Sequence, residues 1–313
     1  MSSKSLYSKR GYVILKSKYT QDQLDKITDD LTCKPFTPTD FGPKSEPFPI
    51  YMENEKKLYL PKHYAFEHPE LGLGNPDKVS ITKGIQIDVE FQGSLQPKQM
   101  EVINAFQASC GDADFNRLSN GGVVCVPCGF GKTVLALYLI GLLKRKTLII
   151  VHKEFLLAQW KERIEKFLPM ARVGSIQGSR IDIQGKDIVI GMLQSLSMKD
   201  YDDSVFQDFG FAIVDECHHI AAEVFSRALP KINSYYCLGL SATPNRSDGL
   251  TRVFQYFLGP IIFKIDKRDD KKILVHNVHF HYRHPSYCKE ELNMMGKACM
   301  PKMITNIDRK SVV

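Results

Sequence analysis

The sequence has no apolar run long enough to cross a membrane. Its longest mainly apolar run, Val134–Leu143, has about half of the roughly 20 residues that a spanning helix needs, and it predicts a buried helix. No apolar stretch follows the basic N-terminus, so we expect no secretory signal. The eight cysteines lack a framework spacing, which argues against a disulfide scaffold. We therefore expect reduced thiols, no membrane partner and a cytoplasmic or nuclear location.

The sequence also lacks repeats, low-complexity tracts and a strong charge imbalance in its middle. Its 313 residues, 43% of them hydrophobic, are enough for about two domains with a sizeable core. The net charge is +7, and the basic excess lies at the two ends: residues 1–20 hold five Lys or Arg and no acid. This distribution fits a polyanionic partner, although an ordinary solvated surface explains it equally well.

The first 92 residues predict a small α+β domain. Gly11–Lys16 is a strand-like run, and Thr20 opens a helix in which Gln23 completes a capping box. Five prolines within residues 33–50 predict an extended connection. Lys57–Leu60 and Ile85–Phe91 alternate like short strands.

From residue 93 onward, short apolar runs alternate with helical patterns. This alternation predicts an α/β fold with a parallel sheet covered by helices on both faces. In such sheets ligands bind at the carboxyl ends of the strands. The predicted strands are Gly122–Val126, Thr147–Val151, Ile188–Ile190, Phe211–Val214 and Tyr236–Leu240, and the predicted helices are Val134–Leu143, Glu154–Phe167 and Ile220–Leu229.

A phosphate-binding loop is predicted after the first of these strands. Glycines there let successive backbone N–H groups face one phosphate, and the following helix N-terminus adds positive charge. Lys132 would reach the β- and γ-phosphates and Thr133 would bind Mg²⁺. The alternative is a glycine-rich turn with an incidental lysine. The loop reads Pro127-Cys128-Gly129-Phe130-Gly131-Lys132-Thr133, and Val126 stands where the consensus has a further glycine.

Two adjacent carboxylates follow the strand Phe211–Val214. Asp215 would hold Mg²⁺, and Glu216 would orient and deprotonate an attacking water. The alternative is an ordinary acidic loop. Because the acidic pair follows a strand downstream of a predicted phosphate loop, metal-assisted phosphoryl transfer is the favoured interpretation.

The Gly-Lys-Thr and Asp-Glu-Cys-His segments together resemble those of superfamily 2 helicases of the DExH branch. The resemblance implies a RecA-like lobe over residues 93–262, with ATP and Mg²⁺ as ligands. Leu95–Gln99 resembles the adenine-side motif, with Gln96 where the family has arginine, and it implies that Gln99 contacts adenine.

Further segments resemble the family's nucleic-acid motifs in the expected order. Leu148–Trp160 resembles motif Ia, Asp187–Leu196 resembles motif Ic, and Leu240–Pro244 with its extension resembles motif III. Trp160 itself is interpreted as a packing residue. The resemblance implies nucleic-acid contacts for His152, Lys153, Gln194, Ser195 and Arg246, a catalytic or coupling role for His218, and coupling through Ser241 and Thr243.

The subgroup that matches best contains duplex-DNA translocases: the helicase of the general transcription factor, helicases of large cytoplasmic DNA viruses, and a phage recombination helicase. The resemblance implies a monomer that acts on duplex DNA, with the transcription machinery as a candidate partner. A viral origin would place it in the host cytoplasm or the virion. Two alternatives stay open, a DExH RNA helicase and a non-catalytic, nucleotide-gated nucleic-acid-binding module.

Motors of this family have a second lobe, which supplies an arginine finger. Residues 263–313 predict a linker and the start of that lobe, without a Gln-x-x-Gly-Arg-x-x-Arg pattern. We therefore expect weak hydrolysis by this chain alone. His276, His279 and His281 in the same region predict a polar strand face rather than a zinc site.

Overall fold

The computed structural model describes residues 7–8, 10–34, 46–73, 82–110, 120–219, 222–232, 234–243, 251–265 and 292. Met1–Arg268 form one compact unit and Asp269–Val313 a second, of which Leu292 is described. The predicted boundaries at residues 92 and 262 stay predictions. Arg246 and the histidine-rich segment lie outside the described residues.

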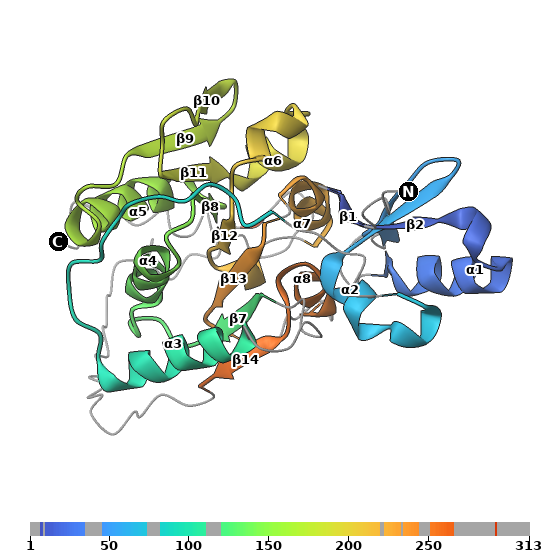
Figure 1. Cartoon of the computed structure of the whole chain (residues 1–313), viewed down its shortest axis with the longest axis horizontal. Coiled ribbons are helices and arrows are strands. Elements are labelled where there is room, and N and C mark those ends of the chain that lie inside the picture. Colours follow the sequence, from blue (N-terminus) through green and yellow to red (C-terminus); the bar gives the residue numbers. More distant parts are fainter. Residues whose placement is uncertain are drawn as a thin grey trace. The chain divides into compact units, whose positions relative to one another are not determined.

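An eight-stranded sheet forms the centre of the first unit (Figure 1), with strand order β10-β9-β11-β8-β12-β13-β7-β14. Its neighbouring strands are parallel except β9 and β10, which are antiparallel. The strands are β7 (Gly121–Cys125), β8 (Thr147–Val151), β9 (Val173–Gln177), β10 (Arg180–Asp182), β11 (Ile188–Met192), β12 (Phe211–Val214), β13 (Tyr236–Ser241) and β14 (Ile261–Lys264).

The predicted α/β class and the five predicted strands are confirmed. The strands over Thr147–Val151 and Phe211–Val214 have the predicted bounds, and all of their residues are buried. Continuous Val, Ile and Leu runs form such strands because both faces of the sheet are covered. Local pattern did not predict β9, β10 and β14. The strand β9 carries Gly174 and Ser175 and therefore lacks a continuous apolar run.

Helices cover both faces of the sheet. One buried cluster joins residues of α3, α4 and α5 to one face, and a second joins α6, α7 and α8 to the other. Consecutive strand residues such as Val123 and Val124 belong to different clusters because their side chains point to opposite faces. The helices are α3 (Pro97–Ser109), α4 (Lys132–Leu143), α5 (Glu154–Phe167), α6 (Leu193–Met198), α7 (Ala222–Ala228) and α8 (Thr251–Leu258).

The N-terminal residues form a smaller α+β arrangement. A four-stranded antiparallel sheet has the order β1-β2-β6-β5, and β3 pairs with β4. The predicted capping box is present, since Thr20 and Gln23 bond each other's backbone N–H at the start of α1. The elements are β1 (Tyr7–Ser8), β2 (Gly11–Leu15), α1 (Gln21–Asp30), β3 (Thr32–Cys33), β4 (Phe48–Pro49), β5 (Met52–Glu53), β6 (Lys57–Leu60) and α2 (Lys62–Glu67).

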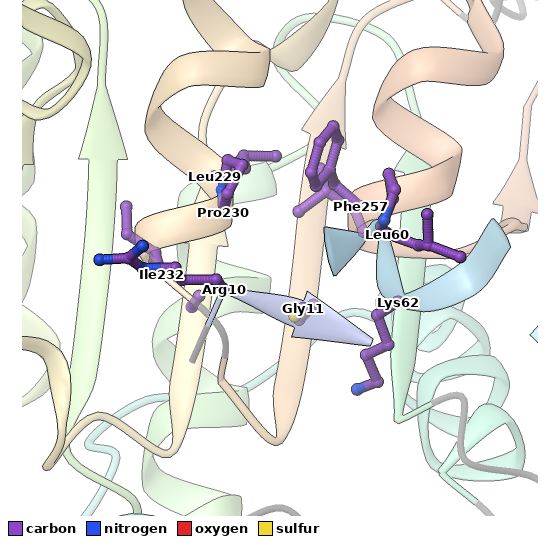
Figure 2. A pocket seen from close by; sticks show the side chains of 12 residues that line it. Arg10, Gly11, Leu60, Lys62, Leu229, Pro230, Ile232 and Phe257 are labelled. Atoms are coloured by element: carbon purple, nitrogen blue, oxygen red, sulfur yellow. The ribbon is translucent and has the colours of Figure 1, made fainter. Parts of the chain in front are cut away.

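The α2 helix packs against α8. The rings of Tyr64 and Tyr256 meet edge to face with centroids 5.3 Å apart, and Lys62 Nζ donates to the carbonyl of Tyr235 at 3.2 Å. One buried cluster runs through both parts of the unit. Figure 2 shows a small cavity at this contact, lined among others by Arg10, Gly11, Leu60, Lys62, Leu229, Pro230, Ile232 and Phe257.

The segment predicted as a strand over Ile85–Phe91 forms no regular strand. It is extended and makes a single bridge, between Gln86 and Arg145. Ile87 and Val89 are buried in the cluster that contains α3, α4 and α5. The apolar alternation therefore reflects burial in that cluster without a continuous ladder partner among the described residues.

Candidate active site

The predicted phosphate loop lies between β7 and α4. Gly129 and Gly131 have φ of 83° and 96°, in the left-handed region that glycine tolerates best. A Cβ at Gly131 would lie 2.5 Å from Nε2 of Gln99, so a larger residue would displace the Gln99 side chain from the loop. Lys132 is the first residue of α4 and is 9% exposed. Because the first-turn N–H groups of a helix lack partners within it, this end of α4 suits an anion.

Gln99 supports the loop from the side. Its Nε2 donates to the carbonyl of Phe130 at 2.8 Å, and its Oε1 accepts from the backbone N–H of Gln96 at 2.9 Å. The side chain is therefore fixed in orientation beside the loop. The predicted adenine contact stays a prediction.

The acidic pair follows β12 at the carboxyl edge of the sheet. The Asp215 backbone N–H donates to the carbonyl of Ile150 at 3.0 Å, and Oδ2 of Asp215 accepts a hydrogen bond of 2.8 Å from Nε1 of Trp160. Asp215 is 6% exposed. Burial raises the pKa of its carboxyl group, and the hydrogen bond from Trp160 opposes that rise.

Glu216 connects the acidic pair to the phosphate loop. Its Oε1 lies 3.0 Å from Nζ of Lys132, and its Oε2 lies 3.4 Å from Nδ1 of His218. Its φ of 48° is positive, which among the described non-glycine residues is otherwise seen at Lys144. Such a conformation costs about 1–2 kcal/mol, and it places strain at the predicted catalytic residue.

The contacts continue into the segment after β13. The Ser241 hydroxyl lies 3.1 Å from Nδ1 of His218 and accepts from the backbone N–H of Thr243 at 3.2 Å. In the sheet β13 lies between β12 and β7. The carboxyl ends of these three strands therefore bring together the phosphate loop, the acidic pair and the Ser-Ala-Thr segment, Ser241–Thr243.

Within the described part of the chain, two buried atoms of this cluster have no hydrogen-bond partner of good geometry. They are Nζ of Lys132, a donor, and Oε2 of Glu216, an acceptor. A phosphate oxygen at the first and a water at the second would satisfy both groups. The Thr133 hydroxyl and the Asp215 carboxylate are the hard oxygen ligands that Mg²⁺ prefers. The residues present thus fit a magnesium nucleotide.

Four of the residues predicted to contact nucleic acid, His152, Lys153, Gln194 and Ser195, lie just after strands β8 and β11 at the same edge of the sheet. Nε2 of Gln194 donates to the carbonyl of His152 at 2.7 Å, which joins the segments after β8 and β11. The Ser195 hydroxyl accepts from the backbone N–H of Gly178 at 2.8 Å and so supports the β9–β10 turn. Lys153 Nζ lies 5.9 Å from the ring centroid of Phe155, which is 64% exposed. Nucleic-acid contact by these residues stays a prediction.

The structure adds one residue to the predicted site. Trp160 is buried, as the packing interpretation predicts, but its indole N–H also bonds Asp215. No local pattern signals this contact because the two residues are 55 positions apart. Over the described ranges, no group of three or more His, Cys, Asp and Glu side chains could hold a metal ion.

Comparison with known proteins shows which family the region around this site is similar to. Residues 92–246 match the family described as "Type III restriction enzyme, res subunit". The chain is 33% identical over 313 residues to the putative ATP-dependent RNA helicase L396 of Acanthamoeba polyphaga mimivirus, covering 97% of this chain and 58% of that protein. It is 35% identical over 143 residues to the DNA 3'-5' translocase XPB2 of Sulfurisphaera tokodaii, covering 46% of this chain and 31% of the relative.

A solved structure has a similar fold. The UvsW helicase from bacteriophage T4 has a TM-score of 0.52 at 15% identity, covering 78% of this chain and 94% of that one. This likeness concerns the fold. The matched family and the named relatives confirm the resemblance of the motifs to superfamily 2 helicases. The chain spans 58% of the viral relative's length and 31% of the archaeal one's. None of the helices described has the length and apolar character needed to cross a bilayer.

Proposed function

We propose that this chain binds ATP and Mg²⁺ and hydrolyses ATP as part of a motor that moves along nucleic acid, with duplex DNA as its track. The contact that carries the proposal is the one between Lys132 and Glu216, 3.0 Å from Nζ to Oε1. It joins a phosphate-binding group to a general base at one sheet edge. His218 and Ser241 extend the connection toward the segments that face nucleic acid in the family.

The residues have distinct roles in this proposal. Lys132 and the loop Pro127–Gly131 hold the phosphates, and Gln99 contacts adenine. Thr133 and Asp215 hold the magnesium ion, which neutralises charge on the transferring phosphoryl group when it is bound. Glu216 orients the attacking water and accepts its proton. ATP hydrolysis is coupled to movement along the nucleic acid through His218, Ser241 and Thr243.

Duplex DNA is proposed because subgroup motifs favour it and because the archaeal relative is a named DNA translocase. RNA is the second candidate, since the relative that covers 97% of this chain is named a putative RNA helicase. In either case the affinity for nucleic acid would come from contacts with its phosphates, so nucleic-acid binding should weaken steeply as the salt concentration rises. His152, Lys153, Gln194, Ser195 and Arg246 are the proposed contacts. We further propose that the protein is monomeric, resides in the cytoplasm or nucleus and has the transcription machinery as its partner.

The test is ATP turnover with and without duplex DNA, single strands or RNA, beside Glu216→Gln. We expect both proteins to bind ATP and the nucleic acid to stimulate turnover in the wild type. Turnover should fall by about 10²–10⁴-fold in the variant, because a general base contributes about that much. If RNA alone stimulates turnover, RNA and not DNA is the nucleic acid along which the motor moves.

A nucleotide-gated binding module without catalysis is the rival from another class. The sequence argues against this rival because it keeps Lys132, Asp215 and Glu216. A site that no longer catalysed hydrolysis would not require all three. Wild-type turnover equal to that of Glu216→Gln on every nucleic acid, with ATP still bound, is expected either of that rival or of a first lobe that needs an arginine finger from a second lobe. The same comparison in a longer protein that carries the second lobe separates the two, because turnover equal to the variant there would favour the rival.

A further inference from the structure

Trp160 lies between the predicted nucleic-acid segment and the predicted metal site. It is the single tryptophan of the sequence. Its helix, α5, begins at Glu154, directly after His152 and Lys153. The side chain is 1% exposed, so the indole is removed from solvent.

The indole N–H has one partner in this setting, the carboxylate of Asp215. The Nε1 to Oδ2 distance is 2.8 Å, and Asp215 is 6% exposed. The backbone N–H of Asp215 is held at 3.0 Å by the carbonyl of Ile150 in β8. The strand β8 and the helix that follows it therefore fix both the main chain and the side chain of Asp215.

We infer that Trp160 is a positioning residue for the magnesium site: by holding Oδ2 of Asp215 it fixes the orientation of the carboxylate that would bind the metal. This inference rests on the proposed function, because it assigns Asp215 to Mg²⁺. Hydrogen bonds of this kind orient metal-binding groups, and their loss typically lowers metal affinity by about 10–100-fold. The same bond links the loop at His152 and Lys153 to the metal carboxylate through a single helix.

A packing role alone makes a different prediction. Trp160 belongs to the large buried cluster of its sheet face, so its removal would lower stability in any case. Phenylalanine fills most of the space but has no donor. Ile164, one turn further along α5 and also 1% exposed, belongs to the same cluster and has no polar group. A loss confined to packing would affect both positions alike and would not depend on magnesium.

The experiment compares wild type, Trp160→Phe and the control Ile164→Val. The affinity for a fluorescent ATP analogue is measured as a function of Mg²⁺ concentration, together with thermal unfolding. We expect the Mg²⁺ concentration at half-effect to rise about tenfold in Trp160→Phe. Affinity for the metal-free analogue should stay at the wild-type value. Ile164→Val should keep the wild-type magnesium dependence even if its unfolding temperature falls.

The outcomes separate this inference from the proposed function. Wild-type magnesium dependence in Trp160→Phe overturns the positioning role and leaves ATP binding in place. Failure of the wild type to bind the analogue in a magnesium-dependent way overturns both.

A second measurement needs no change at Trp160. Because the wild type has one tryptophan, its emission reports on this residue alone. Adding Mg²⁺ in the presence of ATP should change that emission, and Asp215→Asn should remove the magnesium-dependent part. Emission that does not respond to Mg²⁺ and ATP in the wild type would overturn the inference.

Discussion

The ammonium group of Lys132 and the carboxylate of Glu216 are in contact, with Nζ 3.0 Å from Oε1. Lys132 opens α4 after the phosphate loop, and Glu216 follows β12. The phosphates of ATP would compete with Glu216 for the same ammonium group. Nucleotide binding and release of the Glu216 carboxylate are therefore expected to be linked.

Replacing Lys132 with alanine should abolish nucleotide binding and leave the fold intact. Loss of hydrogen bonds to charged phosphates costs about 3 kcal/mol, or about 100-fold in affinity. Titration with a fluorescent ATP analogue measures the affinity, and circular dichroism checks the fold. Lys161→Ala, at an exposed position of α5, is the control. Unchanged ATP affinity in Lys132→Ala would refute the assignment of the loop.

The backbone at Glu216 should favour glycine over alanine. Its φ of 48° costs a side-chain-bearing residue about 1–2 kcal/mol, so Glu216→Gly should be about 1 kcal/mol more stable than Glu216→Ala. Urea unfolding of the two variants measures the difference. The same pair at Lys161, inside α5, should give the opposite sign, because glycine costs about 1 kcal/mol in a helix. Greater stability of Glu216→Ala would show that the strain is negligible.

Ser241→Ala should separate ATP hydrolysis from its stimulation by nucleic acid. The Ser241 hydroxyl contacts His218 and the Thr243 backbone, whereas no contact with Lys132 or Glu216 is seen among the hydrogen bonds described for it. ATP binding should therefore persist while stimulation of turnover falls. The measurement is turnover against nucleic-acid concentration, with Ser109→Ala on α3 as the control, because its hydroxyl bonds a backbone carbonyl away from these segments. Full stimulation in Ser241→Ala would exclude this connection as the coupling path.

His63 should make the protein sensitive to acid. It is 3% exposed, and its Nε2 has no hydrogen-bond partner among the residues that the structure describes. Burial lowers its pKa well below the usual 6.5, and the charge of Lys62 acts in the same direction. The unfolded chain therefore takes up a proton below pH 6.5 that the folded protein refuses. Stability should fall by about 1.4 kcal/mol per pH unit below that value and be unaffected by this group above it.

The His63→Gln variant tests that assignment. Urea unfolding between pH 7.5 and about 5 should give a shallower loss of stability than in the wild type, because glutamine does not titrate. An identical pH slope in the two proteins would assign the acid sensitivity to other groups.

Local sequence patterns determined many of the strands, one helix start and the order of the site motifs in this protein. Thr147–Val151 and Phe211–Val214 are strands as predicted, because continuous apolar runs fit a sheet covered on both faces. The capping box of Thr20 and Gln23 needs only neighbours within one helical turn. The order of the phosphate loop, the acidic pair and the Ser-Ala-Thr segment likewise predicted the helicase domain, since each motif is a short run that follows a strand.

Contacts between distant residues were decided by the tertiary structure alone. The order of the strands places β13 between β12 and β7, and this order brings Lys132, Glu216 and Ser241 together. The partner of Trp160 is Asp215, on a different strand–helix unit, so a buried tryptophan could be predicted but its hydrogen bond could not. Ile85–Phe91 alternates like a strand, yet among the described residues it makes one isolated bridge and no ladder. Apolar periodicity indicates which side chains are buried but does not identify a hydrogen-bonding partner. Sequence spacing fixes what each segment is, whereas the packing of segments far apart in the chain fixes which side chains meet.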